Sequence, residues 1–303
     1  MHIPNGFLTD PVCTVSTLAA TAALGAGFVR VRQLDNSRSA PLMAATGAGI
    51  FAAQMVNFPI DQGTSAHVLG AALAAIVLGP WRGMLTMAVV LAVQCFLFGD
   101  GGTAALGANI LNMAVAGTLV ASALYTLTTH YVAGAKGQLL GAGAAAFGSV
   151  LAAASLCAIE LAASGTYGLA DVFAAMLGVH AVIGLSEALI TVAVVAALAN
   201  RSAGSLVSTR GVMAGGLIAA VVVAGLVAPL ASNAPDGLER VAQDLNFANL
   251  GSDNLWAAVP DYATPGIGWP ALAVALAGIA GVAVVFATAY TVGRTATVKV
   301  RKR

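Results

Sequence analysis

The sequence has few charged residues. Asp, Glu, Lys and Arg make up only 8% of its 303 residues, whereas 59% are hydrophobic. Soluble globular proteins carry roughly 25% charged residues, so this composition cannot cover a surface that faces water. The formal net charge of +1 leaves no strongly basic surface, which argues against nucleic acid as a partner. We therefore expect an all-α, polytopic membrane helix bundle that is surrounded by the lipid bilayer.

Cysteine pairs and nucleotide-binding loops are also missing. Cys13, Cys95 and Cys157 lie far apart and form no CxxC pair, so neither a disulfide framework nor a cysteine metal site is indicated. The chain contains no G-x-x-x-x-G-K-[ST] phosphate-binding loop, so it lacks this means of harnessing ATP. We expect no enzymatic activity and no bound organic cofactor.

No Lys or Arg precedes Arg30. A secretory signal peptide needs a positive segment ahead of its apolar core, and that segment is lacking here. Pro4, Gly6 and Pro11 also stand before the first apolar run. We therefore expect this run to be a retained membrane span, with the residues before it kept in the mature protein.

Nine apolar runs follow one another along the chain. A spanning helix needs ~20 mostly apolar residues. The candidate spans are 12–30, 41–59, 67–80, 82–98, 105–129, 137–163, 171–199, 212–231 and 269–293. The third run is short, which allows a tilted or partly re-entrant helix. Gly79-Pro80 separates it from the fourth, because proline lacks an amide donor and disfavours helical geometry in the residue before it.

The distribution of positive charge gives the orientation. Cations follow the odd-numbered runs: Arg30, Arg32, Arg38, Arg82, Lys136, Arg201, Arg210, Arg294 and the tail Lys299–Arg303. The opposite loops are acidic, with Arg240 as their one cation. Cytoplasmic loops carry the excess of Lys and Arg, so the N-terminus lies outside and the C-terminus in the cytoplasm. This orientation requires an odd number of spans, and about nine fits.

The chain divides into two expected modules. Residues 1–205 hold about seven spans, and residues 206–303 hold two spans that flank a polar segment, 232–268, on the outer side. The stretch Arg201–Arg210, with Gly204 and several serines, is typical of a cytoplasmic linker between them.

The first residues and one histidine form a possible metal-binding set. The amine of Met1, the amide nitrogen of His2 and the His2 imidazole Nδ1 can chelate one ion, and His67 would complete four nitrogen donors in a plane. Tetragonal nitrogen sets favour Cu(II) or Ni(II) over Mg²⁺ or Ca²⁺. Two alternatives remain open at this point: a solvated terminus, and an ordinary hydrogen-bonded role for His67. We interpret His130 as a wet interfacial side chain.

Other polar residues lie near the outer ends of the spans. Candidates for orienting His67, the N-terminal loop or its carbonyls are Gln54, Asn57, Asn109 and Asn112, and plain helix–helix hydrogen bonding is the alternative for these four. Thr64 and Ser65 are candidates for fixing the loop before His67. His180 and Glu187 lie two helical turns apart in the seventh run, where an ionisable group suggests a function. We favour a buried pair that holds helices together, and a metal exit path or coupling contact is the alternative.

Several of these stretches resemble one family. Met1-His2-Ile3 with Gly6-Phe7-Leu8 resembles the N-terminal signature of the cobalt/nickel substrate-binding (M) component of energy-coupling factor transporters. Stretches similar to the same family are Met55–Ile60, Gly63–His67, Leu78–Trp81, Leu106–Met113 and His180–Thr191. Pro235–Glu239 and Pro260–Gly266 resemble the small accessory N component, so the chain looks like an M–N fusion.

The resemblance implies a metal site and partners. Met1, His2 and His67 would bind Co²⁺ or Ni²⁺ as transported substrate, in the cell membrane of a prokaryote. A membrane coupling (T) component and cytoplasmic ATPase subunits would supply the energy, while 232–268 would cover or load the pocket. The alternatives are a self-sufficient secondary metal transporter coupled to protons through Glu187 and His180, and a membrane scaffold that does not transport.

Overall fold

The structure is a computed structural model that describes residues 1–34, 39–61, 63–204, 209–254 and 256–297. Arg38, the basic tail from Lys299 and the expected module boundary after residue 205 lie outside these described residues.

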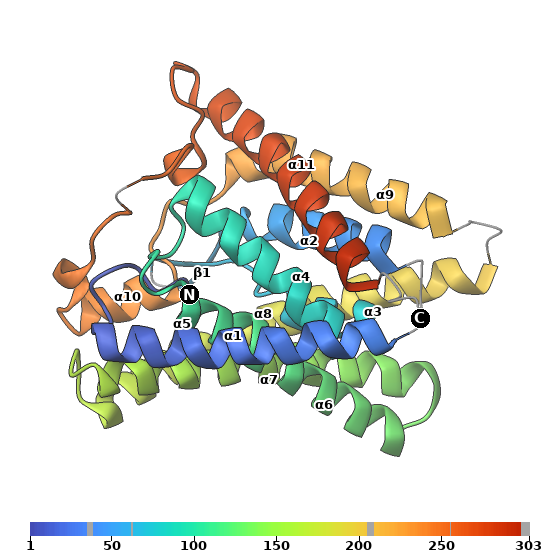
Figure 1. The fold of residues 1–303 in the computed structure, drawn as a ribbon, viewed down its shortest axis with the longest axis horizontal. Coiled ribbons are helices and arrows are strands. Elements are labelled where there is room, and N and C mark those ends of the chain that lie inside the picture. The colour runs from blue at the N-terminus through green and yellow to red at the C-terminus, as the bar shows by residue number, and fades with distance from the viewer. Residues whose placement is uncertain (35–38, 62, 205–208, 255, 298–303) are drawn as a thin grey trace, which may run out of the picture.

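The described chain is a helix bundle, as expected (Figure 1). Seven helical stretches are long and apolar enough to cross a membrane: α1 (Asp10–Gln33), Pro80–Phe98 (α4 and η1), Leu106–Tyr131 (α5, η2 and α6), α7 (Gly134–Ala163), Leu169–Leu198 within α8 (Leu169–Gly204), Met213–Leu230 (in α9, η3 and η4) and α11 (Pro270–Thr297). The polytopic prediction is therefore confirmed.

The expected count of nine spans is not confirmed, because two of the apolar runs form shorter helices. α2 (Ser39–Gln54) has 16 residues and is about 24 Å long. α3 (Ala71–Leu78) has only eight residues and is about 12 Å long. The third run is thus short, as its sequence indicated.

Residues 67–70 lead into α3 without helical structure, and Val68, Leu69 and Gly70 are buried. The third run is therefore an unwound segment followed by a short helix. Gly79, with φ +77°, ends α3, and Pro80 begins α4 (Pro80–Val93).

Small residues let the helices approach closely. A side chain at Gly281 of α11 would lie 2.2 Å from the ring of Phe51 in α2, and one at Gly293 would lie 2.7 Å from Ala40. Glycine and alanine at such crossings allow membrane helices to pack at short distance. The Gly- and Ala-rich composition therefore serves the contact between α2 and α11.

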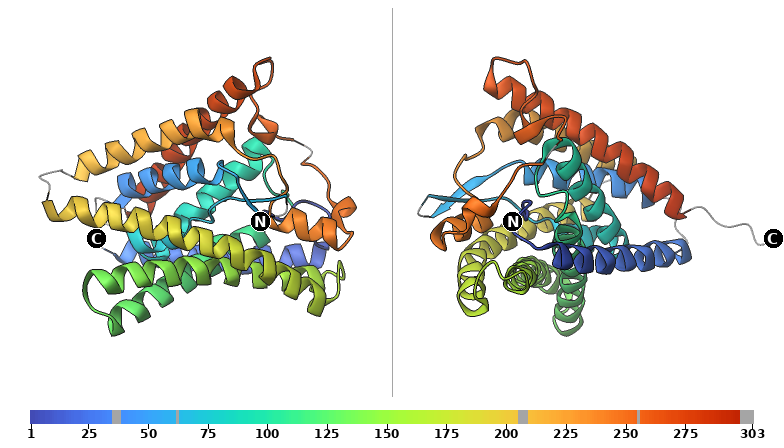
Figure 2. Two further views of the ribbon diagram at one scale, coloured as in Figure 1. Left: turned by 180° about the vertical axis from the view of Figure 1, so that it is seen from behind. Right: turned by 60° about the vertical axis from the view of Figure 1, so that its left-hand side comes forward.

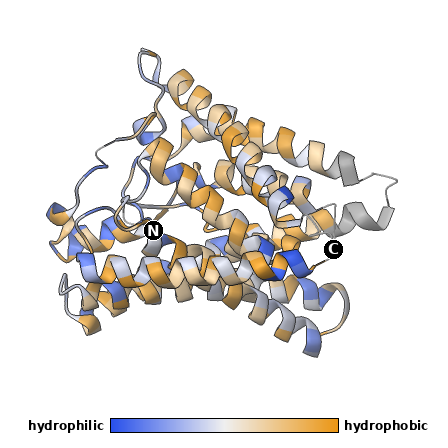
Figure 3. Cartoon of the chain, viewed as in Figure 1, coloured by the Kyte–Doolittle hydropathy of each residue, from blue (hydrophilic) through white to orange (hydrophobic). Residues whose placement is uncertain are grey.

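The longest non-helical segments of the chain gather at one end of the bundle, where the N-terminus also lies (Figures 1 and 2). An antiparallel hairpin of β1 (Phe58–Asp61) and β2 (Thr64–Ala66) lies here, together with the short helix α10 (Gly237–Asp244). Asn5 pairs with Ser252 across an isolated bridge, so the segment after η4 (Ala228–Leu230) lies against the N-terminus. Figure 3 shows blue, hydrophilic colour at this end and orange along the helices.

Sequence-local signals place the start of α10. Asp236 accepts the backbone N–H of Glu239, and the Glu239 side chain accepts the N–H of Asp236. This capping box satisfies two amide groups that the helix cannot pair itself. Leu238 and Val241, three positions apart in this helix, are both buried. Asp236 is therefore fixed at the end of α10 that faces the N-terminus.

Candidate metal centre

The first residues form an extended segment that is fixed to the bundle before α1 begins. Ile3 is fully buried, and Asn109 binds its backbone twice. The Ile3 N–H donates to Asn109 Oδ1 at 2.8 Å, and Asn109 Nδ2 donates to the Ile3 carbonyl at 3.1 Å. The Gly102 amide donates to the same carbonyl at 2.8 Å. The backbone of Ile3 is thus fixed by these hydrogen bonds, and they set the direction in which Met1 and His2 extend.

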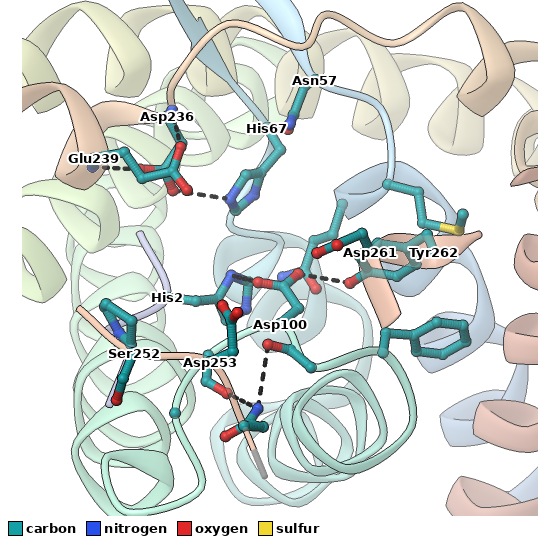
Figure 4. A pocket seen from close by; sticks show the side chains of 18 residues that line it. His2, Asn57, His67, Asp100, Asp236, Glu239, Ser252, Asp253, Asp261 and Tyr262 are labelled. Carbon is teal, nitrogen blue, oxygen red and sulfur yellow. Dashed lines mark hydrogen bonds and ion pairs between the residues drawn. The ribbon is translucent and has the colours of Figure 1, made fainter. Parts of the chain in front are cut away.

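The amino group of Met1 lies beside an imidazole and a carboxylate. Its nitrogen is 3.3 Å from His67 Nε2 and forms an ion pair with Oδ2 of Asp236. The same oxygen of Asp236 is 3.8 Å from His67 Nε2, and Figure 4 shows the two side chains facing each other. The terminus, the segment before α3 and the cap of α10 therefore meet at one point.

The protonation of the His67 ring follows from its neighbours. Its Nδ1 is 3.1 Å from the carbonyl oxygen of Val68, which can only accept a hydrogen bond. Nδ1 therefore carries the proton and donates it, which leaves a lone pair on Nε2 of the neutral ring. That lone pair is directed to the side where the Met1 amine lies.

His2 lies next to His67 on the wall of the same cavity (Figure 4). The two ring centroids are 5.5 Å apart, with the planes inclined by 23°. His2 Nδ1 is 3.0 Å from Oδ1 of Asp100, whose other oxygen accepts the hydroxyl of Tyr262 at 2.6 Å. His2 Nε2 is buried without a hydrogen-bond partner. Both imidazoles and the amine therefore belong to one cluster.

The two carboxylates stabilise positive charge at this end. Burial alone would lower the pKa of the Met1 amine, but the neighbouring carboxylates, Asp236 above all with Asp100 and Glu239, together raise this pKa above its usual value. Burial alone would raise the pKa of Asp236, but the charged amine and His67 hold it well below its usual range. Burial likewise opposes ionisation of Asp100, yet His2 and the Tyr262 hydroxyl hold its pKa far below the usual range. Both carboxylates are thus ionised at neutral pH.

The cluster borders a cavity of about 370 Å³. Besides His2 and His67, its wall includes the acidic residues Asp100, Asp236, Glu239, Asp253 and Asp261. Within the described residues, no three His, Cys, Asp or Glu side chains are arranged to hold a metal ion. The donor set expected from the sequence has only two side chains, because its other two donors are backbone nitrogens of the terminus.

A metal ion that uses these nitrogens must replace their present partners. Asp236 holds the amine, and Asp100 holds the His2 Nδ1 that the chelate would need. A divalent cation would take the place of the ammonium proton and keep a positive charge opposite both carboxylates. The cluster therefore suits a cation, provided that the amine gives up its proton.

The other polar candidates differ in where they lie. Gln54 Nε2 donates to the Leu69 carbonyl at 2.7 Å, two residues after His67. Asn57 lines the cavity, and its carbonyl accepts the amide of Ser232 at 2.7 Å. Each of these residues thus lies next to the segments that carry the cluster.

Ser65, Thr64 and Asn112 face elsewhere. The Ser65 hydroxyl donates to the Ala234 carbonyl at 2.6 Å, so it fixes the segment before Asp236 rather than His67. Thr64 is buried in β2. Asn112 is buried in η2 (Ile110–Ala116), and its Nδ2 donates to Glu160 of α7 at 2.6 Å.

His180 and Glu187 both line a small cavity of about 20 Å³ next to Met1 and His67. No hydrogen bond joins the two side chains to each other in this described part of α8. His180 Nδ1 bonds to the Met176 carbonyl of its own helix at 2.8 Å. Glu187 instead accepts the amides of Leu69 and Gly70, so of these two side chains it is Glu187 that hydrogen-bonds to a segment outside α8.

Sequence reasoning missed the carboxylates of the centre. Asp236 and Asp100 were counted only as acids of the outer loops, although Asp236 belongs to the Pro235–Glu239 motif. Glu160 of α7 was not singled out, although a carboxylate within an apolar run is itself a signal. It is buried and accepts hydrogen bonds from Ser16 and Asn112.

Comparison with known families gives two matches. Residues 2–205 match the CbiM family, described as the cobalt uptake substrate-specific transmembrane region. Residues 210–297 match the PDGLE domain family.

Similar proteins are transport proteins. The chain is 36% identical over 302 residues to a putative fused nickel transport protein NikMN of Archaeoglobus fulgidus, which covers 97% of this chain and 98% of that protein. It is 44% identical over 164 residues to the fused nickel transport protein NikMN of Rhodobacter capsulatus, covering 53% of this chain and 46% of that protein. A crystal structure of a transition metal transporter, 34% identical, superposes with a TM-score of 0.62 over 68% of this chain and 96% of that one.

The contacts of Asn109 generate a prediction. Asn109→Ala leaves the buried N–H of Ile3 without its partner, which costs about 1–3 kcal/mol. The terminal segment should then open roughly 5- to 160-fold more often. We expect faster acylation of the Met1 amine by an amine-reactive reagent, measured by mass spectrometry of the N-terminal peptide. Asn112→Ala is the matched control, because Asn112 is equally buried and binds Glu160 instead. Equal acylation rates in both variants and the unmodified protein would contradict this role.

Proposed function

The chain belongs to the CbiM family of cobalt uptake substrate-specific transmembrane proteins, and from this we propose that it captures Ni²⁺ or Co²⁺ for an ATP-driven energy-coupling factor importer. It is a multi-pass protein of the prokaryotic cell membrane and a transport subunit rather than an enzyme. Beyond this, we propose which residues bind the ion, what supplies the energy and which partner subunits take part.

One observation carries the assignment of the site. The Met1 amine and His67 Nε2, 66 positions apart in the chain, lie 3.3 Å apart with the His2 ring beside them. Such a distance allows both nitrogens to bind one ion after a small adjustment, since Zn–N bonds, for comparison, are about 2.0–2.1 Å long. The amide nitrogen of His2 lies between the amine and the imidazole of the same chelate.

Capture proceeds by exchange of partners. The ion would enter the acidic cavity from the outer side. The amine and the His2 amide would each release one proton to water as their bonds to the metal form, and the proton on His2 Nδ1 would pass to Nε2, which has no partner now. Asp236 and Asp100 lose their bonds to the amine and to His2 Nδ1, and their negative charges then face the bound cation. Nitrogen donors in a plane favour Ni(II).

The segment 232–268 acts in this capture as the outer cover. Asp236 binds the amine directly, and Asn5 binds Asn254 through its side chain at 2.8 Å. Residues 206–303 therefore form an accessory module whose outer segment controls access to the terminus, while residues 1–205 form the metal-binding module.

Transport requires partners of two kinds: a membrane coupling component and cytoplasmic ATPase subunits. Uptake of radioactive Ni²⁺ into reconstituted vesicles tests this requirement. We expect uptake only when both partners and ATP are present, and no uptake when the ATPases carry an inactivating substitution. Uptake by the chain alone along a proton gradient would overturn the proposal in favour of a secondary transporter coupled to protons.

The requirement for a free amine at Met1 generates a further prediction. One residue added ahead of Met1 moves the amine away from His67 and turns the original amine into an amide. We expect the extended protein to lose high-affinity Ni²⁺ binding in calorimetry while it keeps its melting temperature. His67→Ala should also lose binding, whereas His130→Ala, on the exposed end of α6 (Gly117–Tyr131), should not. Normal binding by the extended protein would show that the site is elsewhere.

Acidification should weaken binding, because the amine must lose its proton before it can bind metal. Asp236 raises the pKa of that amine, so protons compete from a higher pH than for an ordinary terminus. Below this pKa, the Kd for Ni²⁺ should rise at least about tenfold per pH unit. Asp236→Asn removes the charge that holds the ammonium, so we expect its binding curve to shift to lower pH. Asp244→Asn, in the exposed ion pair with Arg240, is the control and should leave the curve in place. A constant Kd between pH 8.5 and 6.5 would contradict proton competition.

A further inference from the structure

The unwound segment 67–70 has unusual backbone partners. A chain inside a bilayer must satisfy its polar backbone groups internally, and a segment outside a helix cannot do so by itself. Here side chains take over this task. The Leu69 carbonyl accepts Gln54 Nε2 at 2.7 Å, and the Val68 carbonyl accepts the proton of His67 Nδ1. Two further backbone donors of the segment are the amides of Leu69 and Gly70.

Glu187 binds both of these amides. Its Oε2 accepts the Leu69 N–H at 2.6 Å, and its Oε1 accepts the Gly70 N–H at 2.8 Å. Glu187 is 1% exposed and Leu69 3% exposed, so water does not compete strongly for these bonds. The carboxylate also lies at the N-terminus of α3, where a negative charge is favourable. One side chain of α8 therefore fixes the two residues that connect His67 to α3.

The geometry on either side of the segment leaves it little freedom. Gly70 has φ +80°, a conformation that side chains rarely adopt, and a Cβ there would lie 2.6 Å from Ile50. α3 begins at the next residue. A backbone held at residues 69 and 70 therefore fixes the place of residue 68, whose carbonyl orients the ring of His67.

We propose that Glu187 is a positioning residue for metal capture: through the amides of Leu69 and Gly70 it fixes the Val68 carbonyl and thus aims His67 Nε2 at the Met1 amine. This inference rests on the proposed function, since it concerns the same nitrogen site. Groups that orient a metal-binding imidazole typically change metal affinity 10- to 100-fold when they are lost. The proposal gives the carboxylate a role that needs neither a proton relay nor a bond to the metal.

Glu187→Gln is the decisive variant. A glutamine side chain offers one acceptor oxygen, and its NH₂ group would face one of the two amide donors. We expect roughly 10- to 100-fold weaker Ni²⁺ binding, together with a changed d–d absorption band of the bound Ni(II). Glu187→Asp keeps the charge and both acceptor oxygens, so it should recover part of the affinity and the original band.

Glu160→Gln is the matched control. Glu160 is also a buried carboxylate inside the bundle, but its partners are Ser16 and Asn112, and it does not bind the 67–70 segment. Both variants lose a carboxylate that accepts two hydrogen bonds, so a general loss of stability should appear in both melting temperatures. Only Glu187→Gln should change the absorption band.

The outcomes distinguish a failure of the proposed function from a failure of the positioning role of Glu187. If the unmodified protein shows no planar nitrogen site for Ni²⁺, the proposed function itself fails. If the unmodified protein binds and Glu187→Gln binds with the same affinity and the same band, only the positioning role of Glu187 is overturned. If Glu187→Gln and Glu160→Gln both lose affinity in proportion to their drop in melting temperature, the positioning role is overturned as well.

Discussion

The constraint on which this structure depends is that polar backbone groups inside a bilayer must find partners within the protein. Helices satisfy this constraint along most of the chain. The third apolar run does not, because residues 67–70 are unwound before the short helix α3. The bundle compensates with side chains from α2 and α8, and the result is a rigid, non-helical segment at the point where His67 is needed. The irregular backbone is thus stable only because it is buried among specific polar partners.

The cluster around the Met1 amine adjoins this unwound segment. The Met1 amine, His67 and Asp236 come from three distant parts of the chain. The side chains of His67 and Asp236 both lie within hydrogen-bond distance of the amine. Asn109 holds the terminus from within the bundle, and the capping box of α10 holds Asp236 from the other side. Each member is thus fixed by contacts of its own, so the cluster needs no long flexible side chain to form. Such preorganisation suits the binding of a small ion with fixed geometry.

The segment between η4 and α11 contributes to the cluster around the Met1 amine. The chain between η4 and α11 covers the end of the bundle at which the terminus lies (Figure 1). Asn5 and Ser252 pair there, and Asp236 and Tyr262 reach the amine and Asp100 from the same segment. The carboxylates that hold the nitrogen donors are therefore supplied by both halves of the chain.

The sequence by itself determined the class of the fold, because an 8% charged content is incompatible with a water-facing surface. It also indicated the apolar runs and the short third run, since each depends on neighbouring residues. It pointed to Met1, His2 and His67 as possible donors from their chemistry. Only the tertiary structure decided that Asp236 and Asp100 hold those donors, and that Glu187 binds the amides of Leu69 and Gly70 rather than His180. The physical reason is that these bonds join residues more than 90 positions apart, and no local pattern of hydrophobicity, charge or capping specifies which distant segment a buried carboxylate will meet.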